Sequence, residues 1–270
     1  MRKSVFYSHI VTMAQQESIS IEEALRYARS VGYEGLDTDW AELSEDPHGF
    51  LSRIHAADLQ IASVNVFCDF THTFSPEDMQ EILSTIRSCG CKKAMIIPGF
   101  YSSQGSREAE LPRVIDALRQ TCAMGDALGM TISIEDFDNP LSPCGSIEDV
   151  GTLLEAVPGL MHTFDTGNYA FFDQDMRDAL KRYADRIVHV HLKDRTNSAF
   201  LPGEEPILSV TGAPLYSAPV GCGFIPIGEC LAVLKSRNYE GYLSAEFFGA
   251  SDMRAYLARS SDNISRMLPA

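Results

Sequence analysis

Eight short apolar segments alternate with helical patterns along this chain, and this alternation limits the possible folds more than any other feature. Several of the segments are apolar on consecutive residues, which is typical of a strand that is buried on both faces. We expect strands at residues 5–10, 35–39, 61–67, 94–98, 131–135, 161–165, 187–192 and 242–247.

The segments between these strands carry signals for helices. Ser20 and Ser146 are each followed by acidic residues within three positions, which is the pattern of a capping box. Ser75 is followed directly by a proline, a residue that favours the first turn of a helix. Residues 111–128 and 176–184 carry apolar side chains at helical spacing, so each intervening segment is expected to cross back over the sheet as a helix.

Eight strand–helix units in 270 residues predict a single α/β domain, residues 1–270, in which parallel strands close into a (β/α)8 TIM barrel. An open doubly wound sheet is the alternative, but no G-x-G-x-x-G motif follows the first strand. Residues 195–224 form an unusually long connection after the seventh strand, with several prolines and glycines. We expect this segment to be a loop that serves as a lid or as a contact.

Charge and cysteine content exclude several classes of protein. The net charge is -15 with no basic run, which argues against nucleic acid and anionic membranes as partners. No apolar stretch approaches the length of a membrane span, and the N-terminus is interpreted as a strand rather than a signal peptide. The seven cysteines show no disulfide-like spacing, which favours a reduced, cytoplasmic chain.

Four polar residues stand at the ends of the last four expected strands: Glu135, Asp165, His191 and Glu246. Burying an ionised group costs several kcal/mol unless it is paired or bound to a metal. Any one of them alone could cap a turn or pack in the core, but the ends of successive barrel strands meet on one face. Together they predict a divalent-metal site, with Mn²⁺ or Mg²⁺ preferred and Zn²⁺ or Co²⁺ as alternatives.

This donor set suits proton transfer next to a carbonyl group. A cation that binds adjacent oxygens of a hydroxy-ketone stabilises an enediolate, while one carboxylate removes a carbon-bound proton and another returns one. We expect Glu135 and Glu246 to exchange the proton, and Asp165 and His191 mainly to hold the cation.

Sequence motifs over nearly the whole chain resemble the xylose-isomerase-like TIM barrel superfamily of sugar phosphate isomerases and epimerases. They are SIEEALRYARSVGYEGLDT, SIEDF, FDTGN, HVHLKDR and PVGCGFIPIGECLAVLKSRNYEGYLSAEFF. The resemblance implies that the strand-end Glu, Asp, His and Glu bind the metal, and these fall on the four residues named above. It also implies a small carbohydrate or polyol substrate, and it is consistent with a homodimer or homotetramer.

Two positions depart from the epimerases of this superfamily. Asn168 replaces the histidine that usually follows the strand-six aspartate by three residues. The epimerases also place an arginine some residues beyond the strand-seven histidine, and here Arg195 comes four residues after His191. Lys193 is expected either to contact substrate or to form a salt bridge with a strand-end carboxylate. His189 faces the same way as His191 because they are two apart in a strand, so it is a candidate substrate contact.

The first half of the chain offers further candidates for the pocket. His9, Asn65 and Trp40 are expected to contact substrate, and Asp37, Asp39 and Phe67 lie near the same strand ends. The other histidines, at positions 48, 55, 72 and 162, are interpreted as surface or packing residues. Gly221–Cys222–Gly223 is either a phosphate-binding turn or, as we prefer, a simple turn.

Two enzyme functions remain open. The first is a metal-dependent isomerase or epimerase of a sugar, sugar phosphate or polyol ketone. The alternative is a metal-dependent dehydratase of a keto-inositol or dehydroshikimate-type substrate. A DNA-repair endonuclease on this scaffold needs more histidines than a chain without any after His191 supplies, and a binding protein would not need the complete ligand set. A redox role is disfavoured because no nicotinamide or flavin fingerprint is present.

Overall fold

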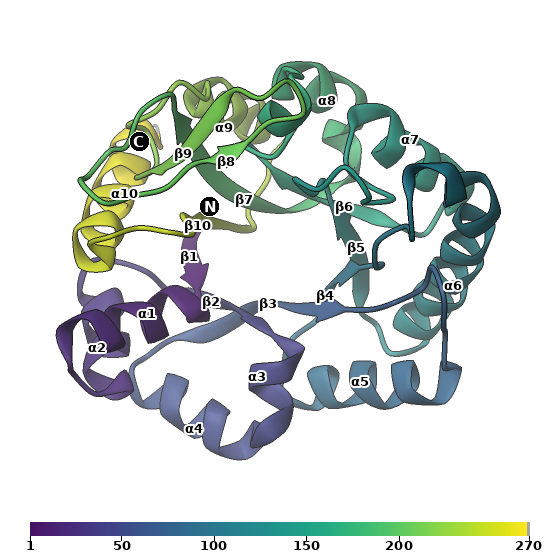
Figure 1. Cartoon of the computed structure of the whole chain (residues 1–270). Coiled ribbons are helices and arrows are strands. Elements are labelled where there is room, and N and C mark those ends of the chain that lie inside the picture. Colours follow the sequence, from purple (N-terminus) through teal and green to yellow (C-terminus); the bar gives the residue numbers. More distant parts are fainter. Residues whose placement is uncertain (269–270) are drawn as a thin grey trace.

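Eight parallel strands close into a barrel in the computed structural model, which describes residues 1–268 (Figure 1). Each strand pairs in parallel with the next one along the chain, and β10 pairs with both β7 and β1, so the predicted TIM barrel is confirmed. The barrel strands are β1 (Arg2–Phe6), β2 (Gly35–Asp39), β3 (Gln60–Phe67), β4 (Lys93–Ile97), β5 (Thr131–Glu135), β6 (Met161–Asp165), β7 (Ile187–Thr196) and β10 (Tyr242–Glu246).

Helices surround the barrel and begin where the sequence signals place them (Figure 1). Ser20 and Ser146 form capping boxes, and the Ser75 side chain accepts a hydrogen bond from the backbone of Asp78. The helices are α1 (Tyr7–Glu17), α2 (Ile21–Ser30), α3 (Trp40–Glu45), α4 (Pro47–Ala56), α5 (Pro76–Ser88), α6 (Arg107–Ala127), α7 (Ile147–Ala156), α8 (Met176–Tyr183), α9 (Ile227–Ser236) and α10 (Met253–Met267). Among the described residues, none of these helices combines the length and apolarity needed to cross a membrane.

The first strand lies earlier in the chain than predicted. It covers Arg2–Phe6 rather than 5–10, and α1 begins at Tyr7. The run VFYSHI looks like a strand by itself, but Ile10, Met13 and Ala14 recur at helical spacing and are all buried. His9 therefore belongs to a helix and not to a strand end.

The connection after β7 is folded, not an irregular loop. β7 continues to Thr196, and the following segment forms β8 (Ile207–Leu208) and β9 (Pro214–Ala218). β9 pairs antiparallel with the end of β7, and β8 pairs with β9, so residues 197–218 form a hairpin flap (Figure 1). The long connection expected over 195–224 does follow the seventh strand, but it contains two short strands because the β7 ladder continues beyond the barrel. Glu204 holds the flap against α10 by accepting a hydrogen bond of 2.7 Å from the Tyr256 hydroxyl.

Candidate metal centre and pocket

Four strand ends bring their polar side chains together at one end of the barrel. Glu135 ends β5, Asp165 ends β6, His191 lies in β7 and Glu246 ends β10. One ligand atom from each lies within 4.8 Å of those of the others, and all four residues are buried. Strand register produces this meeting, because Asp165 pairs directly with His191 across β6 and β7.

The geometry of the cluster fits a cation bound by oxygen and one imidazole nitrogen. His191 Nδ1 lies 2.5 Å from Glu135 Oε1 and 3.3 Å from Glu246 Oε2. Asp165 Oδ1 accepts backbone hydrogen bonds from Gly167 and Asn168, each 2.7 Å long. The other Asp165 oxygen, Oδ2, and Glu246 Oε2 are buried without a hydrogen-bond partner. Their nearest cationic groups are at 3.4 Å (Lys193 Nζ from Asp165 Oδ2) and 3.3 Å (His191 Nδ1 from Glu246 Oε2), and a divalent cation between the two oxygens would bind both directly.

Burial and neighbouring charges shift the pKa values of the carboxyl groups in the cluster in different directions. Burial raises the pKa of Asp165 to about 8 and also raises the pKa of Glu135. Burial acts the same way on Glu246, but Lys193 and then His191 outweigh it and hold the pKa of that carboxyl well below its usual range. Glu246 is therefore the carboxyl that its neighbours favour in the ionised form, whereas burial opposes ionisation of Asp165 and Glu135.

Lys193 occupies the middle of the pocket floor. Its Nζ lies 2.5 Å from Glu246 Oε1 and 3.4 Å from Asp165 Oδ2, and it donates a 2.6 Å hydrogen bond to Asn168 Oδ1. Burial lowers the pKa of this ammonium group, but Asp165 and Glu246 outweigh burial and raise it. The salt bridge that the sequence offered for Lys193 is thus present, and because Lys193 also lines the pocket, its contact with substrate stays a prediction.

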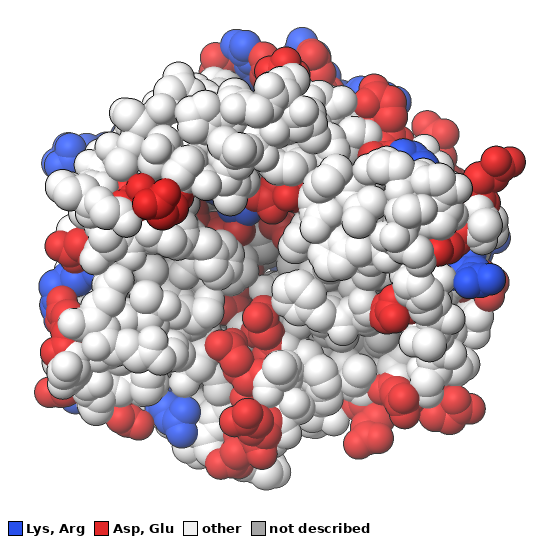
Figure 2. Space-filling model, viewed as in Figure 1, with Lys and Arg blue, Asp and Glu red and all other residues white. Residues whose placement is uncertain are grey.

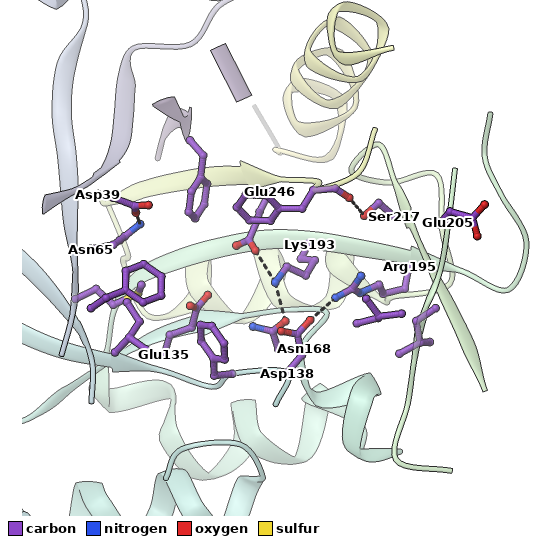
Figure 3. A pocket seen from close by; sticks show the side chains of 18 residues that line it. Asp39, Asn65, Glu135, Asp138, Asn168, Lys193, Arg195, Glu205, Ser217 and Glu246 are labelled. Atoms are coloured by element: carbon purple, nitrogen blue, oxygen red, sulfur yellow. Dashed lines mark hydrogen bonds and ion pairs between the residues drawn. The ribbon is translucent and has the colours of Figure 1, made fainter. Parts of the chain in front are cut away.

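A cavity of about 330 Å³ opens above the cluster. Figure 2 shows a hollow at the centre of this face, with acidic groups on its floor and rim. Four phenylalanines and the flap form most of the walls, and the floor holds Glu135, Asn168, Lys193 and Glu246 (Figure 3). The lining residues are Phe6, Asp39, Asn65, Phe67, Met95, Ile97, Glu135, Phe137, Asp138, Asn168, Lys193, Arg195, Glu205, Ile207, Leu215, Ser217, Glu246 and Phe248.

Two hydrogen-bonded pairs stand at opposite sides of this cavity (Figure 3). Arg195 Nη2 lies 2.8 Å from Asp138 Oδ2, and Asn65 donates a 3.1 Å hydrogen bond to Asp39. Sequence reasoning selected Arg195 and Asn65 but missed Asp138, although it follows the strand-end Glu135 by three residues. It also missed the flap residues, such as Glu205, because their place above the barrel depends on the β7–β9 pairing.

Three predicted substrate contacts do not line the cavity. His9 is buried in α1, stacks on the Phe247 ring and accepts a 3.0 Å hydrogen bond from the Phe247 backbone. Trp40 is the first residue of α3 and packs, partly buried, against the hydrophobic core. His189 points below the pocket floor, where its Nε2 lies 2.5 Å from Asp37 Oδ2. His9 lies in a helix because the first strand ends earlier than predicted, and His189 lies deeper in β7 than the pocket floor. Trp40 follows β2 as predicted, but its side chain packs against the core.

The remaining histidines are surface or packing groups, as expected. His48, His55 and His72 are exposed, while His162 is fully buried, with its Nε2 3.2 Å from Asp136 Oδ1.

The glycine-rich turn after β9 has its amides occupied by a side chain. Asp194 Oδ2 accepts hydrogen bonds from the backbone of Gly221 and Gly223, at 2.9 and 2.8 Å, and its Oδ1 accepts one from Ile225. A Cβ on Gly223 would lie 2.2 Å from the Arg195 carbonyl oxygen, so only glycine fits there. The preferred interpretation, a simple turn, agrees with this arrangement.

Proteins of known name are similar to this chain in sequence or in fold. A curated inosose dehydratase from Geobacillus kaustophilus is 25% identical over 251 residues, which cover 83% of this chain and 79% of that protein. The crystal structure of the probable 3-DHS dehydratase AsbF from Bacillus anthracis superposes with a TM-score of 0.76 at 17% identity, covering 98% of this chain and 99% of the other. A D-psicose 3-epimerase from Clostridium cellulolyticum H10 superposes with a TM-score of 0.72 at 12% identity, covering 100% of both chains.

The two structural likenesses show a common fold and do not separate dehydratases from epimerases. A family model described as xylose isomerase-like TIM barrel matches residues 25–267. The chain therefore belongs to the xylose isomerase-like TIM barrel family.

Proposed function

We propose that the protein is a divalent-metal-dependent dehydratase acting on an uncharged keto-polyol such as an inosose. Of the two functions that the sequence left open, the dehydratase has the better support, because the relative matched over most of the chain is named inosose dehydratase. The observation that carries the proposal is the buried cluster of Glu135, Asp165, His191 and Glu246 beneath a cavity of about 330 Å³. Such a cavity has room for one six-membered polyol ring.

Glu135, Asp165 and Glu246 would hold the cation through oxygen, and His191 through Nδ1. A cation bound there would offset the negative charge that develops on the substrate's carbonyl oxygen. Hard oxygen donors favour Mn²⁺ or Mg²⁺, and the imidazole leaves Zn²⁺ and Co²⁺ as alternatives.

Glu135 is the candidate base. Burial raises its pKa, whereas Lys193 holds the pKa of Glu246 low, so Glu135 is the stronger base of the two carboxylates. Glu135 removes the proton from the carbon beside the carbonyl, and the electrons of that C–H bond form the new carbon–carbon double bond.

Lys193 is the candidate acid. The C–O bond at the next carbon breaks as the double bond forms, and the leaving hydroxyl takes a proton from the Lys193 ammonium group and departs as water. Hydroxide is the conjugate base of water, so even an ammonium group of raised pKa can protonate it. Exchange with solvent then returns a proton to Lys193 and removes one from Glu135.

Charge in the cavity supports an uncharged substrate. Lys193 and Arg195 are the lysine and arginine side chains among the described residues that line it, and each already pairs with a carboxylate. Asp39 and Glu205 add two more carboxyl groups to the lining. A carboxylate or phosphate on the substrate would meet repulsion here, and the amides of the glycine-rich turn are already bonded to Asp194.

The test is turnover by Mn²⁺-loaded protein in deuterated water, read by NMR. The panel contains an inosose, free ketoses, a ketose phosphate and 3-dehydroshikimate. We expect the inosose alone to give a product lacking one molecule of water. EDTA and Glu135→Gln should abolish this activity, and the exposed Glu229→Gln should leave it unchanged. Deuterium exchange on a ketose without loss of water would instead establish an isomerase or epimerase and overturn the proposal.

A further inference from the structure

We propose that Asp37, fixed by His189, is the positioning residue that presents Nδ1 of His191 to the cation. This inference rests on the metal centre of the proposed function. His191 carries two ring nitrogens that face different surroundings: Nδ1 faces Glu135 and Glu246, whereas Nε2 lies 3.1 Å from Asp37 Oδ2. An imidazole binds a metal through one nitrogen, and the partner of the other nitrogen decides where its proton resides.

Asp37 is placed so that one oxygen serves two histidines. It lies in β2 and is fully buried, and its Oδ2 is 2.5 Å from His189 Nε2 as well as 3.1 Å from His191 Nε2. His189 and His191 are two residues apart in β7, with ring centroids 5.3 Å apart and ring planes at 89°. The two Nε2 atoms therefore converge on a single carboxylate oxygen from different directions.

Packing also holds the ring of His191, so the position of the ring and the location of its proton have separate causes. Phe6 packs its ring against His191 with centroids 4.8 Å apart at 68°. Packing of this kind keeps the imidazole in place but does not choose between its two neutral forms. Asp37 makes that choice, because a proton on Nε2 is hydrogen-bonded to it and Nδ1 then keeps its lone pair for the cation.

Loss of Asp37 would have a specific consequence. Glu135 Oε1 lies only 2.5 Å from Nδ1, so a proton is hydrogen-bonded there before the cation binds, and without an acceptor at Nε2 the ring would keep its proton on Nδ1. The nitrogen that should bind the cation would then be blocked, while the four ligand side chains stay in place. A rival interpretation is that Asp37, His189 and His191 themselves form a second cation site, since their donor atoms also lie within 4.8 Å of one another.

Mn²⁺ titration by calorimetry on the full chain tests the inference. We expect wild type to bind one ion and Asp37→Ala to bind one ion about 10–100-fold more weakly. Asp37→Asn keeps an acceptor oxygen, so it should recover part of that loss. The matched control is Ser63→Ala: Ser63 is the register partner of Asp37 on β3, is buried, and its hydroxyl has no hydrogen-bond partner. Its affinity should equal that of wild type.

Nitrogen-15 NMR of labelled histidine with Zn²⁺, which is diamagnetic, reads the protonation directly. At the same Zn²⁺ concentration, wild type should show the His191 proton on Nε2 and Nδ1 bound to the metal, whereas Asp37→Ala should keep the proton on Nδ1. Unchanged affinity and an unchanged proton position in a folded Asp37→Ala would overturn the role of Asp37 and leave the proposed function standing. Two ions per chain, one of them lost in Asp37→Ala, would establish the second site instead. No ion in wild type would overturn both proposals. Should Asp37→Ala fail to fold, Asp37→Asn carries the same comparison.

Discussion

Replacing Lys193 by methionine tests whether the buried charges of the pocket floor are coupled as the structure indicates. Lys193 is about 6% exposed, and its ammonium group lies 2.5 Å from the Glu246 carboxylate. Methionine fills similar space without the charge. In the metal-free protein the variant leaves Glu246 buried without its main cationic partner, and removing one member of a buried ion pair costs about 3–5 kcal/mol.

Protonation of Glu246 sets an upper limit on that cost. From the ordinary value of 4.5 for this carboxyl, taking up a proton at pH 7 costs about 3.4 kcal/mol, since one pKa unit corresponds to about 1.4 kcal/mol. At pH 5.5 the same protonation costs about 1.4 kcal/mol. In wild type the pKa of Glu246 is depressed, so its stabilisation is present above pH 4.5 and is lost only as the pH falls further. The variant should therefore lose about 3 kcal/mol of unfolding free energy at pH 7 and about half as much at pH 5.5.

Thermal unfolding in EDTA at the two pH values measures the difference. For a chain of this size, about 3 kcal/mol corresponds to a fall in Tm of roughly 6–12 °C. Saturating Mn²⁺ should reduce the gap, because the cation replaces the missing charge. The control is Lys181→Met, in which an exposed lysine loses its Asp178 partner and Tm should change little. An equal loss at both pH values that Mn²⁺ does not reduce would show that packing, and not charge, accounts for the effect.

Three further predictions concern the cation, His9 and the glycine-rich turn. Mn²⁺ affinity should rise from pH 6 to pH 8, because Asp165, whose pKa burial raises to about 8, must release its proton to bind the cation. Calorimetry in two buffers of different ionisation enthalpy should show that protons are released at pH 7. A pH-independent affinity would contradict this prediction. His9→Ala should lower the unfolding free energy by about 1–3 kcal/mol, because the backbone amide of Phe247 loses its hydrogen-bond acceptor. A Mn²⁺ titration of the same variant should show nearly unchanged affinity. A large loss of affinity with normal stability would show instead that His9 takes part in the metal site. Millimolar inorganic phosphate should raise Tm no more than chloride at equal ionic strength, because Asp194 already occupies the turn's amides.

The pattern of apolar strands and capped helices predicted the barrel because local propensity and hydrophobic periodicity agree in nearly every unit. The first strand is the instructive exception. In VFYSHI the residues favour a strand locally, but burial of Ile10 and Met13 on one helical face decided otherwise. Because of this error, His9 was expected at a strand end, whereas it lies in α1 and does not line the cavity.

Sequence alone determined which residues meet at the centre. Glu135, Asp165, His191 and Glu246 each stand at or near the end of an apolar run, and barrel closure brings the ends of parallel strands to one face whatever the loops do. Only the tertiary structure decided what surrounds them, because depth within the barrel and pairing beyond it depend on strand register. Register put Asp37 and His189 below the floor, placed Lys193 beside Glu246, and folded residues 197–218 into a flap over the cavity.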